Sequence, residues 1–381
     1  MSDTGVNATL YNLFQLVIRP PQSQASRPVL LLNKQNNCAT TTISSGLYEV
    51  INVSRILFTL ISISLWAALP GCASTKADRS VVETKQPDEG TPQFSTWSSR
   101  RVAWLERGDP QGFPVLYAHG NPGSRLELLF LDAKAKDYGI RLIVMDRPGI
   151  GASSFVSNYG LLDFAADMEK LADEKGLDEF GLMGWSSGGP PVLATAYYLP
   201  QRVRFAISIS GYTNFGEYDK ALQAMSDYGL RGPELSEEHP ALFKQALKVA
   251  RWADLTLPGA YMAVAEAEMP ASDQALLDDK ARSELFVRNQ QEALVQGVKG
   301  AIQDLEVQWA AWPFHLADIQ VPVHIYQGEK DTFVPVEFAR HLAQEIPNAS
   351  LIILPESGHL LPLDQPFMDQ VFTEIQHYME N

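Results

Sequence analysis

Short apolar runs alternate with helix-like stretches along the chain from residue 93 onward. An uninterrupted apolar run of this length is typical of a strand that is buried on both faces of a sheet. Six such runs occur, at 114–120, 141–146, 180–185, 203–210, 321–328 and 350–356. The stretch 161–175 instead repeats apolar residues at three- and four-residue intervals, which predicts an amphipathic helix. This alternation predicts an α/β fold with a mostly parallel central sheet flanked by helices.

A long segment, 213–315, interrupts the alternation. It is acidic and rich in Ala, Leu, Glu and Gln, which favour helix, and it holds few strand-like runs. An insertion of this composition predicts a helical cap over the sheet. We therefore expect residues 93–381 to form one α/β domain with a cap at about 213–315.

The chain ahead of residue 93 follows a different pattern. Arg55 is followed by an apolar run at 56–69 and then by small residues that end at Cys72. The run is shorter than the roughly 20 apolar residues that cross a membrane, and residues 53–71 resemble a bacterial lipoprotein signal peptide. We expect cleavage before Cys72 and a lipid anchor on its thiol. The membrane would then be a partner, and the protein would lie in the bacterial cell envelope.

Two alternatives stay open for this segment. A plain N-terminal anchor fits the same residues, and a cytoplasmic location follows if the segment is not used. Because a signal peptide begins a chain, we interpret residues 1–52 as an extension that is not translated or is disordered, with Val53 as the initiator. Residues 72–92 are polar and lack periodicity, which predicts a tether.

The formal net charge of -15 argues against nucleic acid as a partner. Binding to nucleic acid needs clustered Lys and Arg, and the sequence has no basic stripe. The two cysteines, Cys38 and Cys72, lack the spacing of a metal knuckle or a redox pair. The glycine-rich stretches lack the phosphate-loop and dinucleotide-binding patterns. We expect no nucleic acid, no metal and no cofactor, and the oligomeric state stays open.

One glycine-rich stretch, Gly184-Trp185-Ser186-Ser187-Gly188, has the pattern of a nucleophile elbow. Such an elbow is a strained turn between a strand and a helix, and it needs small residues two before and two after the nucleophile. Ser186 meets this requirement, whereas Ser187 as the centre would place the bulky Trp185 at a small-residue position. An apolar run precedes the motif and a helix-capable run follows it, which is the context that supports it.

A serine hydroxyl needs a base that takes its proton and an acid that orients the base. His359 follows the last predicted strand in a loop, where it could reach the carboxyl edge of the sheet. Asp331 follows the preceding strand, and the interval between the two leaves room for one helix and one strand. Glu329 is an alternative acid. The other histidines fall in predicted strands, helices or the insertion, apart from His119.

The oxyanion of an acyl-transfer intermediate needs two backbone N–H donors. The residue after the nucleophile, Ser187, supplies one, and the loop after the third strand supplies the other. In "HGNPGSR" (119–125) we expect this second donor to be Asn121, with His119 supporting the loop. Trp185, next to the nucleophile, either lines the acyl pocket or packs in the core under the cap.

Five stretches, in this order, resemble the α/β-hydrolase superfamily in its capped serine-hydrolase branch. They are "HGNPGS" (119–124), "DRPGIGAS" (146–153), "GWSSGG" (184–189), "GEKDTFVP" (328–335) and "SGHL" (357–360). The resemblance spans about residues 97–380. It implies a nucleophile at Ser186, an acid at Asp331, a base at His359 and oxyanion amides at Asn121 and Ser187.

The resemblance implies cleavage of a small-molecule carboxylic ester through an acyl-enzyme. Epoxide hydrolases and haloalkane dehalogenases carry aspartate at the elbow, so the serine argues against both. Proline iminopeptidases usually have two glycines before the loop proline, where this chain has Gly120-Asn121. The alternatives are such an aminopeptidase, a lactonase, a hydrolase of carbon–carbon bonds, a cofactor-free perhydrolase and, from another class, a non-catalytic envelope-tethered binding protein.

Overall fold

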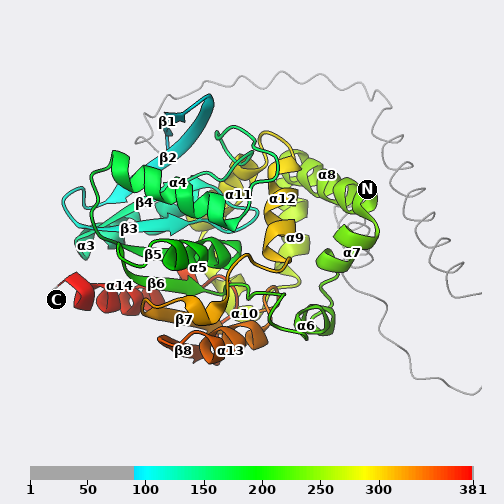
Figure 1. The fold of residues 1–381 in the computed structure, drawn as a ribbon. Coiled ribbons are helices and arrows are strands. Elements are labelled where there is room, and N and C mark those ends of the chain that lie inside the picture. The colour runs from blue at the N-terminus through cyan, green and yellow to red at the C-terminus, as the bar shows by residue number, and fades with distance from the viewer. Residues whose placement is uncertain (1–89, 380–381) are drawn as a thin grey trace, which may run out of the picture. The chain divides into compact units, whose positions relative to one another are not determined.

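A single eight-stranded sheet organises residues 90–379, which are the residues described by the computed structural model (Figure 1). Its strand order is β1-β2-β4-β3-β5-β6-β7-β8. The strands are β1 (Gln93–Trp97), β2 (Arg100–Gly108), β3 (Phe113–Ala118), β4 (Ile140–Met145), β5 (Phe180–Trp185), β6 (Val203–Ile209), β7 (Val323–Gly328) and β8 (Ala349–Leu354). Strand β2 pairs antiparallel with both β1 and β4, and all other pairs are parallel. The six predicted strands are all present, and the predicted α/β fold is confirmed.

Helices cover both faces of the sheet, and the central parallel strands bury residues on both sides. On β3, for example, Leu116 and Ala118 join one core cluster, and Val115 and Tyr117 join the other. The first cluster holds side chains of α4 (Leu161–Glu174), α5 (Gly189–Tyr198) and α13 (Val336–Glu345), and the second holds those of α3 (Asp132–Asp137) and α14 (Gln365–Met379). The predicted helix at 161–175 corresponds to α4.

The stretch between β6 and β7 is helical. It contains α6 (Ala221–Asp227), α7 (Gly232–Glu238), α8 (Pro240–Thr256), α9 (Pro258–Glu266), α10 (Ala271–Leu277), α11 (Lys280–Ala293) and α12 (Lys299–Gln308). In Figure 1, α8, α9 and α12 gather beside the sheet, on the right of the view, and α11 lies nearer its centre. We call the residues between β6 and β7 the helical insertion.

The expectations for the N-terminus lie outside the described residues. These are the extension at 1–52, the signal-like segment with Cys72, and nearly all of the tether. Within residues 90–379, no helix is long and apolar enough to cross a membrane.

Candidate active site

The predicted site residues follow four parallel strands of the sheet. Asn121 comes after β3, Ser186 after β5, Asp331 after β7 and His359 after β8. The carboxyl ends of parallel strands lie at the same edge of a sheet, and ligands of open α/β sheets bind outside that edge. The topology therefore brings together four segments that are far apart in the sequence.

Ser186 occupies a strained turn between β5 and α5. Its φ angle is +55°, a left-handed conformation that non-glycine residues rarely adopt and that is enriched at functional sites. Two glycines make room for this turn. A Cβ atom on Gly184 would lie 2.3 Å from the carbonyl oxygen of Gly188, and one on Gly188 would lie 2.0 Å from that of Ala118. Larger side chains at either position would force the turn apart.

His359 and Asp331 form a buried hydrogen bond. The distance between His359 Nδ1 and Asp331 Oδ2 is 2.8 Å, and the two residues are 8% and 2% exposed. A carboxylate only accepts, so Nδ1 carries the proton and Nε2 is left as an acceptor. The alternative acid, Glu329, is exposed.

Three further donors fix the orientation of the Asp331 carboxylate. Its Oδ1 accepts from the backbone N–H groups of Phe333 (2.8 Å) and Val334 (2.9 Å), and its Oδ2 also accepts from Gln327 Nε2 (2.9 Å). A carboxylate held in this way can orient the imidazole without rotating away from it.

Several carboxylates act on the protonation of His359. Burial alone would lower the pKa of its imidazole, but the negative charges of Asp331, Asp273 and Glu127 outweigh burial and raise the pKa above its usual value. Asp273, on α10, also accepts the backbone N–H of His359 at 2.7 Å. The histidine loop is thus held by the helical insertion as well as by Asp331.

Trp185 packs against the histidine. Its indole N–H donates to the carbonyl oxygen of His359 at 2.9 Å, and the centres of the two rings lie 5.5 Å apart. Phe333 contacts the same imidazole, with ring centres 5.3 Å apart. The residue before Ser186 therefore touches the residue predicted as its base, and Trp185 helps to set the position of the imidazole.

The loop after β3 lies beside Ser186 and is held by hydrogen bonds of His119, Gly120 and Asn121. A Cβ atom on Gly120 would lie 3.5 Å from Cβ of Ser186. His119 contacts the Gly120 carbonyl oxygen through Nδ1 (2.8 Å), and its Nε2 accepts the backbone N–H of Arg147 (3.2 Å). The side chain of Asn121 donates to Asp304 Oδ2 on α12 (2.8 Å). His119 thus supports the loop, as its place in the sequence indicated.

Sequence reasoning missed three carboxylates around the site: Glu127, Asp273 and Asp304. For Glu127 the sequence gives one signal, because it is the only charged residue in the apolar run "LELLF". In the structure its side chain is buried, with 2% exposed. Asp273 and Asp304 belong to the acidic insertion, where they look like solvated surface charges. Their partners lie more than 80 residues away along the chain, so no local pattern reveals them.

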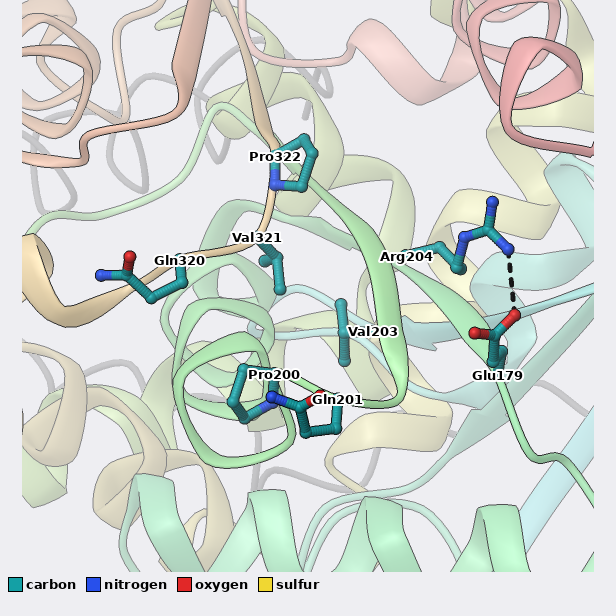
Figure 2. A pocket seen from close by; sticks show the side chains of 8 residues that line it. All are labelled: Glu179, Pro200, Gln201, Val203, Arg204, Gln320, Val321 and Pro322. Atoms are coloured by element: carbon teal, nitrogen blue, oxygen red, sulfur yellow. Dashed lines mark hydrogen bonds and ion pairs between the residues drawn. The ribbon is translucent and has the colours of Figure 1, made fainter. Parts of the chain in front are cut away.

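A separate pocket of about 440 Å³ lies at the opposite edge of the sheet, near the start of β6 (Figure 2). Its lining residues are Glu179, Pro200, Gln201, Val203, Arg204, Gln320, Val321 and Pro322. Arg204 and Glu179 form an ion pair of 2.9 Å at its rim. None of the predicted site residues lines this pocket. The described residues also contain no group of His, Cys, Asp and Glu side chains that could hold a metal ion.

Known proteins resemble this region in both fold and sequence. The family model of the α/β hydrolase fold matches residues 114–366. The dihydrolipoyllysine-residue acetyltransferase component of the acetoin cleaving system of Pseudomonas putida is 27% identical over 279 residues, which cover 72% of this chain and 65% of that protein, less than two thirds of its length.

Two further matches cover nearly the whole of the other protein. Proline iminopeptidase of Neisseria gonorrhoeae is 24% identical over 323 residues, which cover 77% of this chain and 97% of the peptidase. A crystal structure of a carboxylesterase from Nitrososphaera gargenis is similar in fold, with a TM-score of 0.55 and 19% sequence identity. The match covers 76% of this chain and 99% of the carboxylesterase chain. The last likeness is one of fold.

Proposed function

The chain belongs to the α/β-hydrolase family, and we propose that it is a serine hydrolase that cleaves carboxylic esters of small molecules through an acyl-enzyme. The observation that carries this proposal is the buried hydrogen bond between Asp331 and His359, together with the left-handed turn at Ser186, whose neighbour Trp185 contacts the same histidine.

In the proposed reaction, Nε2 of His359 takes the proton of the Ser186 hydroxyl while Oγ attacks the ester carbonyl carbon. The carbonyl oxygen becomes an oxyanion, which accepts hydrogen bonds from the backbone N–H groups of Asn121 and Ser187. Collapse of this intermediate breaks the bond to the alcohol oxygen, which leaves with the proton from His359. Water then attacks the acyl-enzyme with His359 again as base, and this step releases the acid and Ser186.

The second candidate is an aminopeptidase, which uses the same three residues on an amide bond. The match to proline iminopeptidase of Neisseria gonorrhoeae favours it. The loop Gly120-Asn121-Pro122 argues against it, because Asn121 stands where those peptidases usually have a second glycine. Its side chain is also held by α12, through Ala301 O (3.0 Å) and Asp304 Oδ2 (2.8 Å).

Steady-state kinetics on a small panel separates the two candidates. We expect p-nitrophenyl acetate and butyrate to give a higher kcat/KM than proline p-nitroanilide, and Ser186→Ala to lower kcat by at least about 10³-fold. Ser187→Ala is the matched control, because the neighbouring residue keeps its backbone N–H. A higher kcat/KM for the proline amide would establish the peptidase instead. Hydrolysis that survives in Ser186→Ala would exclude both.

A further inference from the structure

We propose that Glu127 is a positioning residue, which holds the turn at Gly120 so that the backbone N–H of Asn121 points to the oxyanion formed at Ser186. The inference rests on the proposed function, since it concerns the same reaction. It adds a residue that lies outside the nucleophile, the base and the acid.

The contacts of Glu127 converge on the loop after β3. The backbone N–H of Gly120 lies 3.0 Å from Oε1 and 3.1 Å from Oε2, and the Tyr117 hydroxyl donates to Oε2 at 2.9 Å. A Cβ atom on Gly123 would lie 2.0 Å from Oε1, so the carboxylate fills the space left by that glycine. One side chain from the 3₁₀ helix η1 (Arg125–Phe130) thus joins the end of β3 to both glycines of the loop.

Gly120 lies between this carboxylate and the nucleophile. A Cβ atom on Gly120 would lie 3.4 Å from Glu127 Oε1 and 3.5 Å from Ser186 Cβ. A small rotation of the Gly120 backbone therefore redirects the next N–H group, that of Asn121. Because Glu127 is 2% exposed, no bulk water replaces its oxygens as acceptors if the carboxylate is removed.

Other charged and polar groups around Glu127 have their own partners. Arg147, which follows β4, donates to the carbonyl oxygens of His119 and Gly120 and pairs with Asp304. Arg125 pairs with Asp146 and Glu292. On α11, Asn289 Nδ2 lies 3.5 Å from Glu127 Oε1, and its side-chain oxygen accepts from Ser124.

The charge of Glu127 has a measurable effect on the pKa of His359, which a side chain that only filled space would not have. Burial raises its pKa to about 7, against the hydrogen bonds from Gly120 and Tyr117, which lower it. When ionised, Glu127 contributes to the raised pKa of His359, together with Asp331 and Asp273. Removing this charge should therefore lower the pKa of the base.

The test compares Glu127→Ala and Glu127→Gln in the full chain. Alanine removes the acceptor, so we expect kcat to fall about 10- to 100-fold with KM nearly unchanged, because the oxyanion contact is made only in the transition state. Glutamine keeps one oxygen for the N–H of Gly120, and its amide can donate to the Tyr117 hydroxyl. We expect it to recover most of kcat near pH 8 and to shift the acid limb of kcat/KM to lower pH.

Asp167→Asn is the control for loss of a buried carboxylate, since Asp167 on α4 binds Arg100 and Tyr159 away from the site loops. It should leave kcat per folded molecule and the acid limb unchanged. Wild-type kcat in folded Glu127→Ala, or a kcat in Glu127→Gln as low as that of Glu127→Ala, would overturn the positioning role while Ser186→Ala stays inactive. An inactive wild-type protein would instead overturn the proposed function, and the positioning role of Glu127 with it.

Discussion

At the scale of single residues, the site depends on one histidine among carboxylates. Its imidazole must be neutral to accept the Ser186 proton, so kcat/KM should rise with pH through the folded-state pKa of His359. That pKa lies above its ordinary value because three carboxylates outweigh burial. The effect on stability has the opposite sign. The raised pKa stabilises the fold fully below the unfolded-state value of about 6.5, and this contribution is lost as pH rises through the folded-state pKa.

Asp331→Asn tests this description. It removes the strongest of the three charges, so the acid limb of kcat/KM should shift to lower pH, and kcat should fall by about 10⁴ because the imidazole loses its oriented tautomer. A pH–rate profile between pH 5 and 9 measures both effects. Glu329→Gln is the matched control, since this exposed residue should leave the profile unchanged. If Glu329→Gln had the larger effect, the acid would be misassigned.

At the scale of elements, the sequence predicts the features that depend only on neighbouring residues, such as a buried strand. Continuous apolar runs indicate strands because strands buried on both faces need them, and the candidate residues follow those strands directly. Strand β1 was not identified because Gln93, Phe94 and Thr96 are exposed and it has no buried run, and β2 was missed although its residues 102–105 are a short buried apolar run. The exclusion of Ser187 as the elbow centre could be predicted because it depends only on side-chain size at Gly184 and Trp185.

Contacts between distant elements could not be predicted in this way. Asp304 on α12 binds the Arg147 guanidinium through both carboxylate oxygens, at 2.6 and 2.7 Å, across 157 residues of sequence. The side chains of Arg147 and Asp304 are only 3% and 14% exposed. An acidic helix carries no sign of which of its carboxylates is buried against an arginine.

Asp304→Ala tests the importance of this contact. It leaves a buried guanidinium without its carboxylate, which should cost about 3–5 kcal/mol of unfolding free energy. Asn121 also loses a hydrogen bond, so kcat should fall as well. Denaturant unfolding measures the first effect, and Glu306→Ala, at an exposed position on the same helix, is the control. Equal stability of the two variants would contradict the account.

At the scale of the whole domain, the helical insertion holds loops of the candidate site in place through hydrogen bonds. Asp273 on α10 binds the histidine loop, whereas Asn289 on α11 and Asp304 on α12 bind Ser124 and Asn121 of the loop after β3. Three successive helices thus hold two segments beside the carboxyl edge of the sheet, the histidine loop and the loop after β3. Changes in the insertion should therefore affect the chemical step as well as the choice of substrate.

We propose that the fold activates Ser186 as a nucleophile, and labelling with a fluorophosphonate measures this activation. This probe forms a covalent phosphonyl bond with an activated serine, and intact-mass and peptide mass spectrometry locate the adduct. We predict one adduct per molecule on the wild type and on Ser187→Ala, mapped to Ser186, and none on Ser186→Ala. Labelling of folded Ser186→Ala at the wild-type rate, or no labelling of the folded wild type, would contradict the account.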